Sequence, residues 1–208
     1  MLSCSNLTFA YNTDKKFLFP NFSVEDGKTL LLLGNSGKGK TTLLHLLALI
    51  LNPASGEIWL DNQIISNLNA QESLKVRAEK IGVVYQKPHF VSALTVLENL
   101  VLSNFLANKK QDIEKAKNLA SILGFEDLLN KKTLSLSGGE LQRVGIARAV
   151  MNTPKIILAD EPTSSLDDEN CEKVIQLLEN QANTIGASLI IVTHDHRLKN
   201  RFSNQIEI

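Results

Sequence analysis

A glycine-rich segment between an apolar run and a helix-length segment constrains this chain more than any other feature. Residues 34–42 satisfy the pattern G-x-x-x-x-G-K-[ST]. The preceding run, 29–33, predicts a strand covered on both faces, and residues 39–51 predict a helix. Glycines in such a turn let consecutive backbone N–H groups converge on phosphate oxygens at the start of a helix. The segment therefore predicts a phosphate-binding site in an α/β fold.

Nucleotide contacts are expected along the whole segment. They are Gly34, Asn35, Ser36, Gly37, Lys38, Gly39, Lys40, Thr41 and Thr42. Lys40 would place its charge on the β- and γ-phosphates, and the Thr41 hydroxyl would bind Mg²⁺. Lys38 lies between two glycines, and its extra charge requires no role. The competing interpretation, a turn that merely caps a helix, is disfavoured because the flanking elements are the expected ones.

Two carboxylates follow another apolar run. Residues 155–161 read Lys-Ile-Ile-Leu-Ala-Asp-Glu, which places Asp160 and Glu161 at the carboxyl edge of a sheet, where ligands of such sheets bind. Asp160 would help to hold Mg²⁺, and Glu161 would polarise an attacking water. The acids could instead only end a strand or cap the helix after Pro162. Their combination with the phosphate loop favours the catalytic interpretation.

Further apolar runs complete an α/β pattern in one domain of 208 residues. Strands are expected at 2–9, 17–24, 29–33, 81–85, 156–159, 189–193 and 205–208, and helices at 39–51, 96–107, 113–123, 138–152 and 168–180. The first two strands, joined by a polar turn at 12–15, belong to an N-terminal antiparallel β subdomain. Residues 87–134 lack a convincing strand. We therefore expect a helical subdomain there, inserted between core segments 1–86 and 135–208.

Charge and cysteine content exclude several classes of protein. The chain has 22 basic and 22 acidic residues, so no net field favours nucleic acid, and none is expected as a partner. The cysteines, Cys4 and Cys171, are too few for a disulfide framework, and a reducing cytoplasm fits them. The N-terminus does not resemble a signal peptide, and the most apolar window, 43–51, is too short to cross a bilayer. Any action on membranes is therefore expected to need a membrane-spanning partner.

Further motifs accompany the phosphate loop at 34–42 and the acidic segment at 155–161. Residues 136–140, Leu-Ser-Gly-Gly-Glu, resemble the signature of ATP-binding cassette (ABC) proteins, and residues 159–167 resemble their Walker B segment and D-loop. Gln86 and His194 each follow a predicted strand, as the Q-loop glutamine and the switch histidine of that family do. Tyr11 lies where the adenine-stacking aromatic is expected. The resemblance covers nearly the whole chain and implies a P-loop NTPase core of the ABC type.

The resemblance also implies how the site works. In the family, two cassettes pair head to tail, so that the signature of one covers the ATP and Mg²⁺ held by the other. A second copy is thus an expected partner. The residues that would contribute to this shared site are Ser137, Gly138, Gly139, Glu140 and Asp167 for nucleotide, Gln86 for metal and catalysis, and Glu161 and His194 for catalysis.

Alone, each of these residues has a simpler interpretation. Ser137 would be an ordinary helix N-cap, Gln86 a surface amide, and His194 a turn histidine. Tyr11 would be a packing residue, with Phe9 and Phe17 as rival stacking candidates. Only the resemblance raises them to functional candidates.

An ATP-hydrolysing subunit of an ABC transporter, peripheral on the cytoplasmic face of the inner membrane, is the function that the resemblance implies. An integral membrane permease would dock on the helical insertion. The apolar residues Phe90, Val91, Leu94 and Val96 are candidate contacts. Ser165 occupies the D-loop position that alanine or glycine usually holds in the family, so one small residue replaces another.

Glu140 replaces the commoner glutamine of the signature, as in a branch that includes lipoprotein-release, macrolide-export and cell-division cassettes. Export or extraction of lipoprotein or hydrophobic cargo is therefore expected, with cell-division-type signalling as the alternative. Soluble cassettes that act on DNA or ribosomes are disfavoured, because one cassette is present and only about fifty residues separate Gln86 from Ser137. A simple P-loop kinase would not explain the signature or His194.

Overall fold

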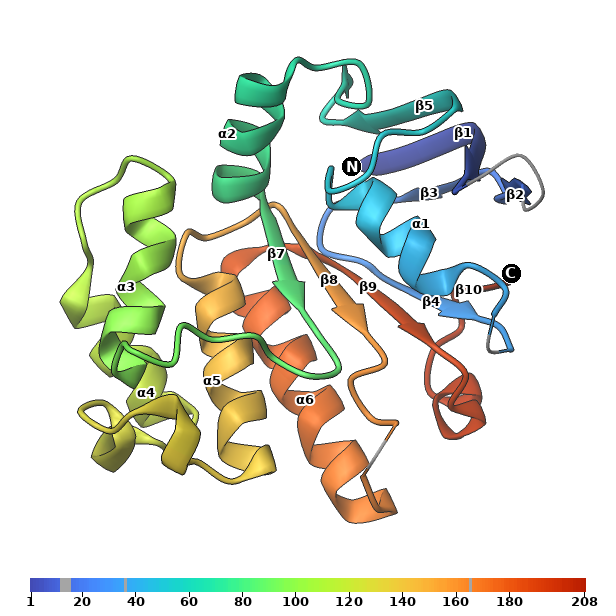
Figure 1. Ribbon diagram of the computed structural model, residues 1–208. Helices are drawn as coiled ribbons and strands as arrows, with labels where there is room; N and C mark the ends of the chain where they lie inside the picture. The colour runs from blue at the N-terminus through green and yellow to red at the C-terminus, as the bar shows by residue number, and fades with distance from the viewer. Residues whose placement is uncertain (12–15, 36, 165) are drawn as a thin grey trace.

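Two β-sheets and the helices around them make up the computed structural model, which describes residues 1–11, 16–35, 37–164 and 166–208 (Figure 1). The strands are β1 Leu2–Ala10, β2 Lys16–Leu18, β3 Phe22–Val24, β4 Thr29–Leu33, β5 Ser55–Leu60, β6 Gln63–Ile64, β7 Ile81–Val84, β8 Ile156–Asp160, β9 Ser188–Thr193 and β10 Gln205–Glu207. The α-helices are α1 Lys40–Leu47, α2 Ala70–Lys80, α3 Val96–Leu106, α4 Ile113–Ile122, α5 Gly138–Val150 and α6 Asp168–Ile185. Short 3₁₀ turns occupy Glu126–Leu128, Thr133–Ser135 and His196–Asn200. The expected turn at 12–15 and the assignments to Ser36 and Ser165 lie outside the described residues.

One sheet is parallel, with strand order β10-β4-β9-β8-β7. Along its central strands, successive side chains point alternately into two separate hydrophobic cores. Leu30 and Leu32 of β4 pack in the core that contains α1, and Leu31 and Leu33 pack in the core that contains α5 and α6. Strands buried on both faces in this way read as unbroken apolar runs, which is why the sequence pattern predicted them.

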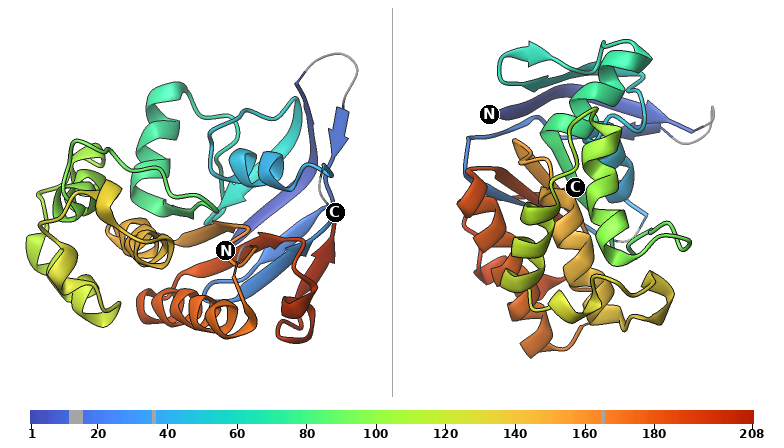
Figure 2. Two further views of the ribbon diagram at one scale, coloured as in Figure 1. Left: turned by 60° about the horizontal axis from the view of Figure 1, so that its bottom comes forward. Right: turned by 90° about the vertical axis from the view of Figure 1, so that its left-hand side faces the viewer.

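The second sheet is antiparallel and covers α1 from the other side. Its order is β2-β1-β5-β6, with β3 also paired to β1. Figure 2 shows α1 between the two sheets, with α5 and α6 on the opposite face of the parallel sheet. Every parallel strand thus points its carboxyl end toward the edge where α1 begins, and this edge carries the predicted site.

Side-chain caps define where several helices begin. Thr95 and Glu98 form a reciprocal capping box at α3, and Ser137 and Glu140 form one at α5. Asp167 caps α6 by accepting a hydrogen bond from the Asn170 N–H. These boxes satisfy N–H groups that a helix leaves unpaired in its first turn.

Some sequence-based boundaries were wrong. The strand expected at 17–24 is split, because Pro20 cannot donate a ladder hydrogen bond, so that β2 pairs with the outer half of β1 and β3 with the inner half. The helix expected at 39–51 ends at Leu47, since Leu49 adopts a positive φ of 57°. The final helix was predicted too short: α6 continues to Ile185, before Gly186 ends it in the left-handed region.

Three elements were missed altogether. Strand β5 mixes half-buried polar and apolar residues, β6 has only 2 residues, and α2 buries none of its side chains. Each therefore lacks the apolar periodicity that prediction depends on. Between 88 and 134 the structure contains helices and an isolated bridge between Thr95 and Lys132, but no named strand. None of the helices among the described residues has the length and hydropathy needed to cross a bilayer.

Candidate nucleotide-binding and catalytic site

The glycine-rich loop connects β4 to α1. Gly37 and Gly39 have φ angles of 82° and 93°, in the left-handed region that favours glycine. Gly34 is required for a different reason: a Cβ there would lie 2.9 Å from the backbone oxygen of Ile208. Since α1 begins at Lys40, the loop delivers its N–H groups at a helix N-terminus, which suits an anion.

Lys40 is the buried cation of this loop, with only 6% of its side chain exposed. Its Nζ donates to the backbone oxygen of Asn35 at 3.2 Å and lies 3.4 Å from Glu161 Oε1. The structure therefore brings together the lysine of the loop and the second acid of the strand β8. A buried ammonium needs such partners, because an unpaired buried charge is costly.

Asp160 and Thr41 form the second contact between the two motifs. Thr41 Oγ1 donates to Asp160 Oδ1 at 3.3 Å. Burial of Asp160 raises the pKa of its carboxyl, and the hydrogen bond from Thr41 opposes that rise only in part. A hydroxyl and a carboxylate side by side are oxygen ligands of the kind that Mg²⁺ takes, with water and phosphate supplying the remainder.

Glu161 lies at the end of β8 with a φ of 47°, an unusual conformation for a residue other than glycine. Its Oε2 accepts from Thr193 Oγ1 at 2.8 Å, and its Oε1 lies 2.8 Å from His194 Nδ1. Burial opposes ionisation, but the hydrogen bonds from His194 and Thr193 outweigh it, and the pKa of Glu161 lies below its usual value. The carboxylate is therefore ionised and aimed by the end of β9.

A cleft of about 440 Å³ brings together nine of the predicted residues. It is lined by Tyr11, Phe17, Gly37, Gly39, Lys40, Thr41, Thr42, Gln86, Glu161 and His194. Tyr11 is 60% exposed, and its hydroxyl lies 3.1 Å from Thr42 Oγ1. Its ring meets Phe9 edge to face at 4.8 Å and Phe17 edge to face at 6.2 Å, so all three aromatic candidates for stacking lie together beside the cleft.

Gln86 also reaches this cleft. Its Nε2 donates to Ser164 Oγ at 2.7 Å, and Ser164 Oγ in turn donates to the Glu161 backbone oxygen at 3.3 Å. The amide of Gln86 is thus connected to the segment that carries the catalytic candidate. Ser164 and Thr193 were not predicted as site residues, and neither hydroxyl stands out in the sequence except by its position beside an assigned residue.

The signature residues lie elsewhere. Among described residues, none of 137–140 lines the cleft around Lys40; Gly138 and Gly139 line a neighbouring pocket with Gln86 and Pro162. Ser137 Oγ and the Ser137 N–H both donate to Glu140 Oε2 at 2.7 Å. Within the part of the chain that the structure describes, the N-termini of α1 and α5 therefore line two neighbouring pockets, which share Gln86 and Glu161.

The family model described as ABC transporter matches residues 20–164, more than half of the chain. The chain therefore belongs to the ABC transporter family, as its ATP-binding, ATP-hydrolysing cassette. This confirms the resemblance noted in the sequence and the expected fold class.

Solved structures agree with this assignment. The ATP-binding cassette MJ0796, in a dimeric post-hydrolysis state bound to ADP and Pi, is 32% identical, with a TM-score of 0.89 over 100% of this chain and 94% of that chain. The cbiO1 protein from Clostridium perfringens, described as part of the ABC transporter complex cbiONQ, is 31% identical, with a TM-score of 0.81 over 93% of this chain and 78% of that chain.

Proposed function

We propose that two copies of this chain close head to tail on two MgATP and that this closure drives a membrane-spanning partner. The observation that carries the proposal is the division of the site in one chain: among the described residues, none of 137–140 lines the Lys40 cleft, and Gly138 and Gly139 line a neighbouring pocket instead. A twofold pairing completes both at once. The dimeric state of the similar cassette MJ0796 supports it.

For the nucleotide, we assign adenine stacking to Tyr11 and phosphate binding to residues 34–42 and Lys40. Thr41 and Asp160 would hold Mg²⁺, and Gln86 would reach it after releasing Ser164. The ion would neutralise charge that develops on the phosphate oxygens. Glu161 would orient the attacking water or accept its proton, and His194, which contacts this carboxylate, would also reach the γ-phosphate.

The test of the shared site uses Ser137→Arg. The larger, charged side chain at the α5 end would block a partner's nucleotide, so turnover should fall to background while one chain still binds ATP. Mixing Ser137→Arg with Lys40→Ala chains should restore about a quarter of wild-type turnover, since one of two sites is intact in half of the dimers. Full activity of Ser137→Arg alone refutes the shared site.

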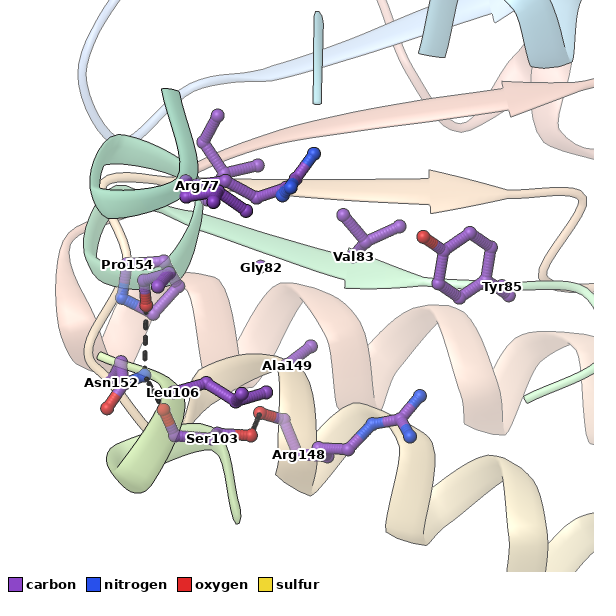
Figure 3. Close-up of a pocket in the computed structure, with 13 residues that line it drawn as sticks. Arg77, Gly82, Val83, Tyr85, Ser103, Leu106, Arg148, Ala149, Asn152 and Pro154 are labelled. Carbon is purple, nitrogen blue, oxygen red and sulfur yellow. Dashed lines mark hydrogen bonds between the residues drawn. The ribbon is translucent and has the colours of Figure 1, made fainter. Parts of the chain in front are cut away.

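The surface for a membrane partner would be a groove of about 450 Å³ between α2, β7, α3 and α5 (Figure 3). Its rim carries Leu74 and Leu106, which are 56% and 65% exposed. Gly82 forms the floor, where a Cβ would lie 2.4 Å from the Ala149 backbone oxygen. An apolar groove with exposed leucine side chains at its rim suits a short amphipathic helix of a permease.

Charge adds a requirement for that helix. Figure 3 shows Arg77 and Arg148 on either side of β7. Within the described ranges neither forms an ion pair with a carboxylate; Arg77 donates to the Leu49 backbone oxygen and Arg148 to that of His89. We therefore propose that the docking helix presents a carboxylate to this groove.

The earlier candidates for docking fare differently. Val96 is fully buried and Phe90 is partly buried under the guanidinium of Arg148, at 4.5 Å from Cζ to ring centroid. Val91 is 46% exposed and remains a candidate. Val96 is thus a core residue, whose apolar character reflects packing of α3.

Docking is tested by changing the groove without touching the nucleotide site. The Leu74→Glu and Leu106→Glu variants should keep the ATPase activity of the isolated chain and lose co-purification of a membrane-spanning protein that the wild type retains. Ile122→Glu, at a 56% exposed position on α4 outside the groove, is the matched control. Equal co-purification by all variants would exclude this groove.

For the cargo we propose a lipoprotein or another hydrophobic molecule that is exported or extracted. The support is Glu140, which resembles the corresponding residue of that branch. Transport by the reconstituted complex of a lipid-linked cargo would test it, and ATP use without transport would favour the cell-division type of signalling.

A further inference from the structure

Arg197 occupies a position that none of the motifs includes, yet it is hydrogen-bonded to both loops that flank the catalytic candidates. It lies three residues after His194, in the 3₁₀ turn that follows β9. Its Nε donates to Asp195 at 2.8 and 3.1 Å, and its Nη2 donates to Asp195 Oδ2 at 2.7 Å. The guanidinium therefore holds the residue next to His194 through two nitrogens.

The same guanidinium reaches the loop after β8. Its Nη1 donates to Asp168 Oδ1 at 2.7 Å and to the Leu166 backbone oxygen at 3.2 Å. Its Nη2 also donates to the Thr163 backbone oxygen at 3.3 Å. One side chain thus connects both ends of the segment 163–168, which follows Glu161, to the segment that carries His194.

Asp195 makes this connection rigid. Only 8% of its side chain is exposed, and it also accepts from Thr163 Oγ1 at 2.8 Å. A buried carboxylate shared by a hydroxyl and a planar guanidinium leaves little freedom for the backbone on either side. Lysine could not reproduce these contacts, because its ammonium is a single point whereas the fork of arginine spans several acceptors.

We propose that Arg197 is a positioning residue for hydrolysis: it fixes His194 relative to Glu161 and transmits movements of segment 163–168 to His194. The proposal rests on the roles proposed above for Glu161 and His194. The two are 2.8 Å apart across the loops that Arg197 joins, so a displacement of either loop changes that contact directly. Because Asp167 lies in the joined segment and is exposed, the pairing of two chains at this segment would be felt at His194 of the same chain.

A purely structural role is separable, because the same turn has a second arginine. Arg201 forms ion pairs with Glu172 and Glu179 of α6 and so anchors the end of the turn to that helix. Among the described residues, its side-chain hydrogen bonds go to these two glutamates and not to Asp195 or to residues 163–168. Arg201 is therefore a matched control for the loss of an arginine from this turn.

The experiment compares Arg197→Lys and Arg197→Ala with Arg201→Lys and Arg201→Ala in the full chain. Turnover, KM for ATP, ATP affinity and thermal stability are measured for each. Misplacing a catalytic group by about 1 Å can cost on the order of 100-fold in rate, so Arg197→Ala should lower kcat by about ten- to 100-fold with KM changed less than about threefold. Arg197→Lys should rescue little, and both Arg201 variants should keep kcat within about twofold at equal or larger loss of Tm.

Three outcomes overturn the inference: unchanged kcat in both Arg197 variants, a fall no larger than the loss of folded protein, or an equal fall in the Arg201 variants. Glu161→Gln separates this inference from the proposed function. If Glu161→Gln is inactive and the Arg197 variants are fully active, only the role of Arg197 fails. If Glu161→Gln turns over normally, the proposed role of Glu161 fails, and the role of Arg197, which rests on it, fails too.

Discussion

Replacing Glu161 by glutamine tests two properties of the site at once, catalysis and the competition for Lys40. Glutamine keeps the size of the side chain but removes the charge. A general base contributes about 10²- to 10⁴-fold to rate, so kcat should fall by that factor, or about 3–5 kcal/mol in the barrier. ATP-bound dimers should accumulate because closure no longer leads to hydrolysis.

The effect on ATP affinity follows from the contact between Glu161 and Lys40. Glu161 Oε1 lies 3.4 Å from the buried Lys40 ammonium, so phosphate must take Lys40 away from this carboxylate. Glutamine removes the negative charge beside Lys40, leaves the hydrogen bond of Lys40 to the Asn35 carbonyl, and presents an uncharged amide where Thr193 donates. A buried group that loses its partner costs about 1–2 kcal/mol, which raises the energy of the apo state and should tighten ATP binding about five- to thirtyfold.

Phosphate release measures turnover, calorimetric titration measures affinity, and sedimentation measures the dimer. Glu114→Gln, on an exposed carboxylate of α4, is the matched control and should match the wild type in all three. Wild-type turnover in Glu161→Gln would remove Glu161 from the mechanism. Low turnover with weaker ATP binding would refute the competition with Lys40.

Three further predictions concern other residues. Lys40→Ala should weaken ATP binding by at least about 100-fold in titration, because a buried charge-assisted contact to phosphate is lost, whereas Lys155→Ala should match the wild type. Gly82→Ala should lower the free energy of unfolding by about 1–3 kcal/mol in urea, because its Cβ would lie 2.4 Å from the Ala149 oxygen; Gly138→Ala, with nothing within 4 Å, should change it by less than about 0.5 kcal/mol, and equal effects would contradict the packing argument. The hydrogen bond from Arg197 lowers the pKa of Asp195 from 3.8 to about 2. The ionised Asp195 therefore stabilises the folded state fully above about pH 4, and this contribution is lost as the pH falls through 2. After allowance for screening at the 38% exposed Arg197, this amounts to about 1–2 kcal/mol, and Asp195→Asn should remove it from unfolding curves at pH 5 but not at pH 2.

The parallel sheet and its phosphate loop could be predicted because each has a local signal. Strands β4, β8 and β9 are covered on both faces and read as apolar runs, and the loop has its own residue pattern. Strand β5 and helix α2 carry no such signal. Their stability depends on pairing with β1 and on the capping box of Asn69 and Glu72 rather than on a buried face.

The candidate site could be predicted as a set of residues but not as a set of contacts. Parallel strands imply that Asp160 and His194 share one edge of the sheet, but no pattern specifies the contact of Glu161 with Lys40 or the two donors from β9. Arg197 had no signal, because its partners after β8 lie 29 to 34 residues away in sequence and become neighbours only when β8 and β9 pair.

Each half of the proposed shared site has hydrogen-bond or ion-pair partners within its own chain. Lys40 is held by Glu161 and Asn35, and the Ser137 end of α5 is held by its own Glu140 carboxylate. Hydrogen bonds from Ser137 keep the pKa of Glu140 below its usual value, so this helix end already has an anion. A partner's phosphate therefore has to displace Glu140, just as bound ATP has to displace Glu161 from Lys40. Because each step exchanges one anion for another, we expect closure of two chains to be most favourable when one nucleotide replaces Glu161 of one chain and Glu140 of the other together.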